Sequence, residues 1–236
     1  LLDDAGLLVL RTPGLTQVVE TFATLLVASR VRVLWVVCMG EYAWRRLDYQ
    51  FAIGRYFTDV VLVPYLDEPS LEKVLMHHHE CCSGLGLRIV RRIEDAGGPE
   101  EDQEELRPQY FRELHRVSGG NLRSAIFHWL KDAVHDPERG EVRIPFPRTL
   151  DLGFIRGMER SHRFALGEIL VHGGLSLEEF GEVFQTGLIE SRLVLEYLHA
   201  GRLVEKKPRS GCTDYRISPV FHLGVAEALA LENIIY

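Results

Sequence analysis

Residues 1–10 read LLDDAGLLVL, and the interpretation of the whole chain turns on this stretch. Two leucines lead directly into the paired carboxylates of Asp3 and Asp4. An apolar strand that ends in two acids suits a nucleotide hydrolase, because one carboxylate can hold Mg²⁺ while its neighbour orients the attacking water. The same residues also occur at an ordinary turn after a strand. The stretch therefore gives a hypothesis that the rest of the sequence has to support.

Composition places the chain among ordinary globular proteins. It has 236 residues, of which 46% are hydrophobic and 26% charged, a length that predicts one to two domains. A net charge of −7 argues against a broad basic surface for nucleic acid. The longest apolar run, residues 31–40, contains Arg32 and is too short to cross a bilayer. Four irregularly spaced cysteines favour a reducing, cytoplasmic compartment without a disulfide framework, and no membrane partner is expected.

The first 68 residues alternate between strand and helix patterns. Strands are predicted at the start of the chain, in VRVLWVVCMG (31–40) and in DVVLVPYL (59–66), with helices between them. Continuous β-branched runs of this kind are typical of parallel strands that are buried on both faces. The order predicts a partial α/β parallel sheet with right-handed crossovers.

The rest of the chain shows two further patterns. Residues 69–150 predict an all-helical segment, with Ser70 and Asn121 as N-caps of two of its helices. Residues 151–236 predict three helices, the second opened by a Ser176–Glu179 capping box, then a β-hairpin around RSGCT and a last helix. Three helices followed by a two-stranded wing is the winged-helix pattern. The predicted domains are therefore 1–68, 69–150 and 151–236.

Two arginines lie where a side chain could contact phosphate. Arg123 follows a Gly-Gly break and sits in the first turn of a helix, where the helix N-terminus already favours anions. Arg55 ends a helix directly before a predicted strand, from which it could reach the nucleotide of a neighbouring subunit. Taken singly, each is better explained as a surface arginine.

The succession of these features resembles the AAA+ ATPases, in particular the origin-recognition and Cdc6-like branch that carries a C-terminal winged helix. The resemblance starts at LLDD and covers nearly the whole chain. It implies that Asp3 and Asp4 are the Walker B pair, with Asp3 binding Mg²⁺. It also implies that Arg55 is the arginine finger and Arg123 is sensor 2, and that Asn121 and Arg123 lie at the ATP site.

The same resemblance predicts a fragment. No GxxxxGK[ST] motif occurs in the chain, so the first strands and the P-loop are expected upstream. The fragment would be the C-terminal half of a P-loop NTPase core, a helical lid and a winged helix, and it is expected to be unable to hydrolyse ATP alone. The intact protein is expected to hydrolyse Mg-ATP at the interface of a homo-oligomer.

Departures from the family keep two rivals open. The second Walker B acid is usually Glu rather than Asp4, and no Asn, Thr or Ser follows VRVLWVVCMG at the sensor 1 position. These departures favour a nucleotide-dependent signalling switch that hydrolyses little. The other rival is a winged-helix regulator without nucleotide chemistry, which binds DNA or a protein partner.

The charge of the predicted winged helix bears on whether this region binds DNA. Residues 151–236 contain nine Lys and Arg against twelve Asp and Glu, a net charge of −3. Only the hairpin is basic, and Lys206, Lys207 and Arg209 are the candidates for contact with DNA phosphate. A protein-interaction role for the winged helix is the other reading.

The run HHHECC at residues 77–82 also suggests a metal site. His78, Cys81 and Cys82 share a helical face, but a closed zinc site needs four ligands and no second cluster follows at a ligand spacing. A helix with partly buried cysteines and exposed histidines is the preferred interpretation.

Overall fold

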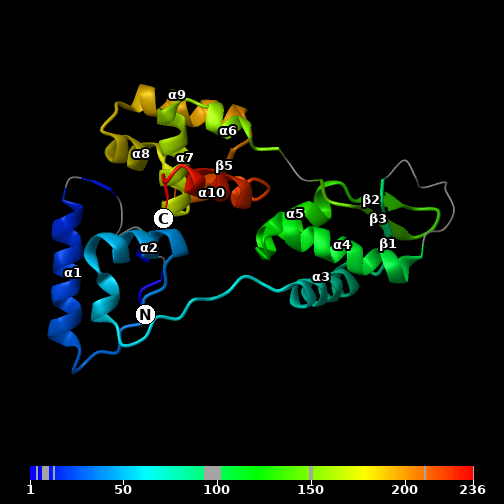
Figure 1. Ribbon diagram of the computed structural model, residues 1–236, viewed down its shortest axis with the longest axis horizontal. Coiled ribbons are helices and arrows are strands. Elements are labelled where there is room, and N and C mark those ends of the chain that lie inside the picture. The colour runs from blue at the N-terminus through cyan, green and yellow to red at the C-terminus, as the bar shows by residue number, and fades with distance from the viewer. Residues whose placement is uncertain are drawn as a thin grey trace. The chain divides into compact units, whose positions relative to one another are not determined.

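The chain folds into two compact units of mixed α/β structure. The computed structural model describes residues 1–3, 5–6, 11–12, 14–92, 102–148, 151–209 and 211–235. Unit 1 consists of residues 1–62 and 152–236, and unit 2 of residues 63–151. Among the described residues, each unit has one three-stranded sheet, in the order β4-β6-β5 in unit 1 and β1-β3-β2 in unit 2 (Figure 1). The first and last parts of the chain thus fold together into one compact unit.

The elements of unit 1 come from both of its segments. The first supplies α1 (Leu15–Ser29), α2 (Glu41–Phe51) and the short 3₁₀ helix η2 (Ile53–Tyr56). The second supplies α6 (Phe154–Gly157), α7 (Arg160–His172), β4 (Leu175–Ser176), α8 (Leu177–Phe184), α9 (Leu188–Ala200), β5 (Val204–Arg209), β6 (Cys212–Ile217) and α10 (His222–Leu231). Unit 2 contains α3 (Glu68–Cys82), β1 (Gly86–Val90), α4 (Gln103–Ser118), α5 (Leu122–Lys131), β2 (Val134–Asp136) and β3 (Glu141–Pro145).

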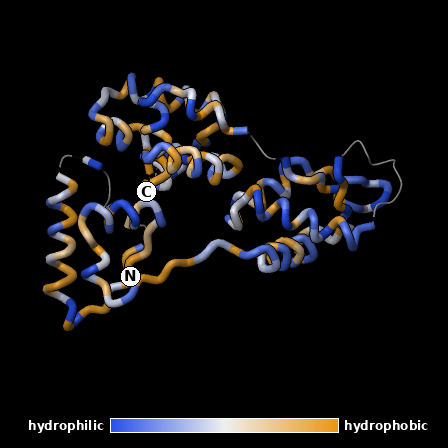
Figure 2. Tube along the Cα trace, viewed as in Figure 1, coloured by the Kyte–Doolittle hydropathy of each residue, from blue (hydrophilic) through white to orange (hydrophobic). Residues whose placement is uncertain are grey.

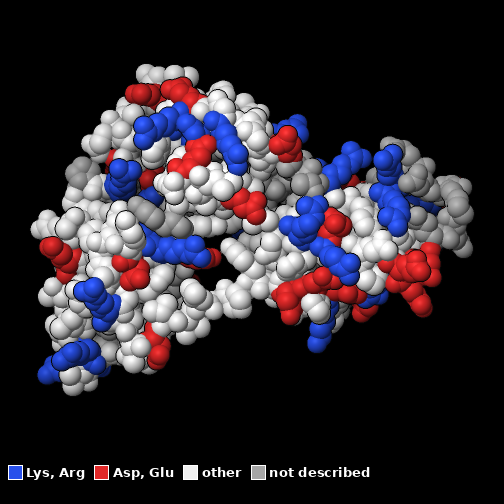
Figure 3. All heavy atoms as spheres, in the orientation of Figure 1, with Lys and Arg blue, Asp and Glu red and all other residues white. Residues whose placement is uncertain are grey.

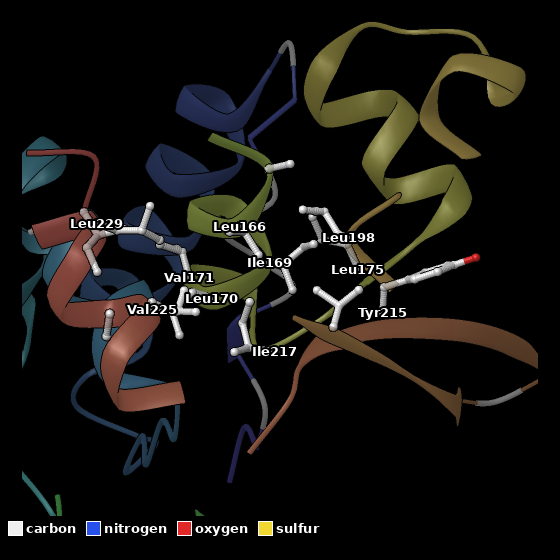
Figure 4. Packing of buried hydrophobic residues seen from close by; sticks show 14 of the residues in the cluster. Leu166, Ile169, Leu170, Val171, Leu175, Leu198, Tyr215, Ile217, Val225 and Leu229 are labelled. Atoms are coloured by element: carbon white, nitrogen blue, oxygen red, sulfur yellow. The ribbon is translucent and has the colours of Figure 1, made fainter. Parts of the chain in front are cut away.

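Helix α7 lies at the centre of unit 1. Its residues Leu166 and Ile169 are fully buried, and Figure 4 shows them among side chains from α9, α10 and the sheet. The same cluster includes Ala43 and Leu47 of α2. Because the core takes residues from both segments, α1 and α2 are held by the elements that follow residue 152.

Local sequence signals in the last third of the chain are confirmed. Strands β5 and β6 pair antiparallel from Val204↔Ile217 to Arg209↔Cys212, which is the predicted hairpin. The capping box is also present: Ser176 N donates to Glu179 Oε2 at 2.7 Å, and Glu179 N donates to Ser176 Oγ at 3.2 Å. The short strand β4 adds the third strand by pairing with β6.

The predicted parallel sheet is not formed by the described residues. Neither 31–40 nor 59–66 is a strand, and a single parallel bridge joins Leu2 to Val37. Leu2 N donates to Val36 O at 2.8 Å, and Cys38 N donates to Leu2 O at 2.9 Å. A parallel strand is stabilised by the ladder that its neighbours provide, and here one bridge is all that the described residues supply.

The prediction that residues 69–150 are all-helical is wrong. Strand β1 pairs in parallel with β3, and β2 pairs antiparallel with β3. Strands β1 and β3 have only five residues each, and their Ile89 and Ile144 are buried in the core of the unit. An alternation of apolar and polar residues over so few positions is too short to recognise among the surrounding turn residues. The N-cap of α3 is Asp67 instead of Ser70, whose backbone N–H donates to Asp67 Oδ1 at 2.9 Å.

Gly120 has a structural reason for being glycine. Its φ is +75°, and its carbonyl accepts a hydrogen bond from Leu66 N at 3.1 Å. A Cβ at this position would penetrate the backbone carbonyl of Leu66. The segment that leads into α3 therefore approaches the Gly-Gly break closely, through the backbone of Leu66.

Replacing Gly120 by Ala should destabilise unit 2 by roughly 2–4 kcal/mol, because the strain of a positive φ adds to a backbone clash. Gly140→Ala is the matched control, since Gly140 has a φ of +63° in the same unit with open space around its Cβ position. It should cost only about 1 kcal/mol. Urea unfolding measures the loss, and hydrogen exchange should place it in residues 102–148. Equal effects of the two substitutions would refute the clash.

Candidate functional site

The structure describes only one member of the predicted acidic pair. Asp3 is exposed and directly follows Leu2, the residue that bridges to Val37. Its backbone therefore lies beside the end of segment 31–38. Asp4 lies outside the described residues.

Arg55 is exposed on η2, immediately after α2. The turn that carries it is held by the left-handed Ala52, with a φ of 50°, and by Asp48, whose Oδ1 accepts from Gly54 N at 2.9 Å. Arg55 thus projects from an ordered corner of unit 1.

Asn121 and Arg123 lie at the N-terminus of α5 in unit 2. Asn121 is confirmed as the N-cap, with Oδ1 accepting from Ser124 N at 3.1 Å. Arg123 is exposed in the first turn. The buried face of the helix carries Ala125 and Trp129 instead, so Arg123 points away from the core. Asp3 and Arg55 belong to unit 1, and Asn121 and Arg123 to unit 2.

The basic residues of the hairpin are all paired with carboxylates. Lys206 Nζ lies 2.7 Å from Glu196 Oε1, Lys207 Nζ lies 3.5 Å from Glu205 Oε1, and Arg209 pairs with Glu179 and, at 3.5 Å, with Asp214 Oδ1. The hydrogen bond from Lys206, together with one from Tyr215, lowers the pKa of Glu196. Each of the three cations proposed for DNA contact therefore has a carboxylate partner within the hairpin or its supporting helices.

The histidine and cysteine run forms pairs and no larger cluster. On α3, Cys81 Sγ lies 3.7 Å from His77 Nε2, and Cys82 Sγ lies 3.8 Å from His78 Nε2. All four cysteines are exposed and unbridged. Within the described part of the chain, no group of three or more His, Cys, Asp or Glu residues is arranged to hold a metal ion.

A buried ionic cluster is the feature that the sequence analysis missed. Arg46 of α2 makes two hydrogen bonds to Glu168 of α7, from Nη1 to Oε2 at 2.6 Å and from Nη2 to Oε1 at 3.0 Å. The side chains are 8% and 3% exposed. His172 Nε2 lies 3.4 Å from Glu168 Oε2, and Arg11 Nη1 lies 3.4 Å from Glu168 Oε1.

This cluster is electrostatically stabilised. Burial by itself would raise the pKa of Glu168, but hydrogen bonds and positive charge from His172 and Arg46 lower it to about 2. One signal was available: Glu168 interrupts the apolar run ALGEILV in the middle of a helix. Its partner could not have been found, because Arg46 is 122 residues away.

Glu168→Gln should destabilise unit 1 by about 3–5 kcal/mol at pH 7, because it leaves the guanidinium of Arg46 buried without its counter-ion. Since the folded pKa lies below the ordinary value of 4.5, the wild-type contribution is complete above about pH 4.5 and disappears as pH falls toward 2. Urea unfolding at several pH values measures both effects.

The control for that prediction is Glu196→Gln, which removes an exposed partner of Lys206. It should cost less than about 1 kcal/mol. A double variant, Arg46→Met with Glu168→Leu, should recover most of the lost stability because no buried charge remains. If Glu168→Gln and Glu196→Gln lowered the free energy of unfolding by the same amount, the buried cluster would not be a main source of the stability of unit 1.

Comparisons with known proteins add no identification. No family model matches the chain, and no curated protein or solved structure is significantly similar to it. Among the described residues, none of the helices combines the length and the apolar character that crossing a membrane requires.

Proposed function

We propose that this chain is the C-terminal portion of an AAA+-type ATPase, which hydrolyses Mg-ATP at a subunit interface of a homo-oligomer. The observation that carries the proposal is the single parallel bridge between Leu2 and Val37 in unit 1, which we interpret as the edge of an incomplete sheet. Segment 31–38 pairs along one edge with the start of the chain, while Trp35 on one face packs against Phe22 of α1 and Leu34 and Val36 on the other face are exposed.

The hydrogen bonds define which edge is open. In the bridge between Leu2 and Val37, the groups that pair are those of Val36 and Cys38. The N–H and C=O of Val37 itself point to the opposite edge, as alternation along a strand requires. Among the described residues, no backbone partner is recorded for them there. A further parallel strand fits this edge.

Side-chain exposure supports the same conclusion. Leu34 is 87% exposed and Val36 47%, and Val61 in the following segment is 84% exposed. Figure 2 colours much of the extended trace after η2 as hydrophobic. Apolar runs of this kind are buried on both faces in α/β proteins. A P-loop strand between the two segments, with covering helices, would bury them.

The arrangement of residues 160–217 supports the winged-helix part of the proposal. Helices α7, α8 and α9 are followed by the β5–β6 hairpin, and the short β4 between α7 and α8 completes an antiparallel sheet. Arg46 and Glu168 join this region to α2, so a movement of α2 would be transmitted to α7.

The roles of the residues follow from the resemblance. Asp3 supplies a carboxylate of the kind that Mg²⁺ prefers, at the end of the bridged segment. Asp4 would orient the attacking water, Arg55 would reach a neighbouring subunit's nucleotide, and Arg123 at the N-terminus of α5 would contact phosphate. Their exposure leaves all three described residues accessible to a ligand.

A signalling switch with little hydrolysis is the second candidate. Segment 31–38 ends at Cys38, and only Met39 and Gly40 lie between it and the start of α2 at Glu41, so the sensor 1 position carries no amide or hydroxyl side chain to orient the γ-phosphate. Turnover by the intact protein distinguishes the two candidates.

In the protein encoded by the complete reading frame, we expect a GxxxxGK[ST] motif within roughly 100 residues upstream, the scale of half a domain. Arg55→Ala should lower kcat by about 10³-fold and Arg123→Ala by about 100-fold. Phosphate release measures both. Arg30→Ala and Arg112→Ala, exposed arginines of the same two units, are the controls.

Mixing the two inactive variants tests the subunit interface. If Arg55 acts on a neighbour's nucleotide, mixed oligomers of Arg55→Ala and Arg123→Ala contain some complete sites and regain turnover. Nucleotide binding with turnover at the level of Asp4→Asn would favour the signalling switch. Absence of both an upstream P-loop and ATP binding would refute the ATPase proposal.

A further inference from the structure

Helix α9 carries an apolar stripe on the side that faces away from its own core. Ile189, Leu193 and Tyr197 are 81%, 67% and 56% exposed, and Leu188 at the start of the helix is 57% exposed. Residues spaced by four lie on one face of a helix, so the stripe runs for about 12 Å along it. The opposite face, with Leu195 and Leu198, is fully buried.

The ring of Tyr197 is held in place by a neighbouring helix. It stacks on His162 of α7, with ring centroids 4.3 Å apart and an interplanar angle of 30°. One end of the stripe is therefore ordered before any partner binds, which reduces the entropy lost on binding.

An acidic hollow adjoins the other end of the stripe. It has a volume of about 440 Å³ and is lined by Glu178, Gly181, Glu182, Gln185, Thr186 and Leu188. Glu190, on the first turn of α9, is exposed nearby in sequence. Among the described residues, Glu178, Glu182 and Glu190 have no recorded cationic partner. In Figure 3, acidic side chains gather along the rim where Figure 1 draws α9.

This combination does not suit DNA. A recognition helix that reads the major groove needs basic and amide side chains, whereas the exposed side of α9 offers Arg192 beside Glu190 and the apolar stripe. The lysines and the arginine of the hairpin are already paired. Phosphate would be repelled by the carboxylates.

We propose that the exposed surface of α8 and α9 binds a basic amphipathic helix of a partner protein. The apolar residues of that helix would lie on Ile189, Leu193 and Tyr197. Its Lys or Arg residues would pair with Glu178, Glu182 and Glu190, as in other helix-in-groove complexes. This inference goes beyond the proposed ATPase function and does not depend on nucleotide chemistry.

Charge also decides against two other occupants. A second copy of this chain placed symmetrically on the same surface would bring acidic residues against acidic residues. A membrane surface with anionic lipids would be repelled in the same way. A positively charged helix is the occupant that satisfies both the apolar stripe and its acidic border.

The test uses the 236-residue chain and a fluorescent synthetic peptide of roughly 18 residues, five helical turns, with Leu on one face and Lys on the flanks. Fluorescence anisotropy should give a micromolar Kd. A scrambled peptide of the same composition and a peptide with Glu for Lys should bind at least about tenfold more weakly, because they lack the apolar face or the charge.

Matched variants locate the binding. Leu193→Ser should raise Kd at least about tenfold, whereas Leu231→Ser on α10, a leucine that is 68% exposed, should change it by less than about twofold. Glu182→Lys with Glu190→Lys should weaken binding of the Lys peptide and strengthen that of the Glu peptide. Circular dichroism checks the fold, and Ile189→Ser replaces Leu193→Ser if the latter unfolds.

Several results would overturn the inference. Equal affinity for the ordered and scrambled peptides would do so, as would equal effects of Leu193→Ser and Leu231→Ser. Self-association in sedimentation that Leu193→Ser abolishes would assign the stripe to a second copy. Binding to anionic vesicles or duplex DNA that requires Leu193 would assign it to those ligands. None of these outcomes depends on whether the intact protein hydrolyses ATP.

Discussion

The bidentate pairing of Arg46 with Glu168 is the constraint on which unit 1 depends. It joins α2 to α7 across 122 residues of chain, inside a core where neither charge could remain without the other. Hydrophobic contacts between Ala43 or Leu47 and the α7 cluster are non-directional and would tolerate sliding of one helix along the other. A two-point hydrogen bond fixes both the register and the orientation of the helices.

Glu179 of α8 likewise connects two elements of unit 1 through its charge. Its carboxylate closes the capping box at the start of α8 and also pairs with Arg209 of the hairpin. Asp214, fully buried on β6, pairs with Arg209 and Arg216. The hairpin is therefore bound to the helices through ion pairs that use its basic residues, which leaves few positive charges for an external ligand.

Two kinds of exposed apolar surface have different physical meanings. In segment 31–38, no partner among the described residues is recorded for the backbone groups of Val37, and the side chains of Leu34 and Val36 are exposed. Helix α9 is a regular helix of 13 residues and exposes the apolar side chains of its stripe beside carboxylates. The first is what the ATPase proposal interprets as the edge of an incomplete sheet, and the second is the surface that we propose for a partner helix.

The sequence by itself determined the local features of this protein: the capping box at Ser176, the N-cap at Asn121 and the β5–β6 hairpin depend on residues within a few positions of each other. It also predicted the mixed α/β class and the exposure of Arg55 and Arg123. Only the tertiary structure decided that Glu168 pairs with Arg46 and that the backbone of Leu66 lies against Gly120 too closely for a side chain there. It also decided that each basic residue of the hairpin has an acidic partner. The strands in residues 86–145 likewise depend on pairing between distant segments. Such contacts are set by the packing of the whole chain, and no periodicity or short motif encodes which distant residue will be the neighbour.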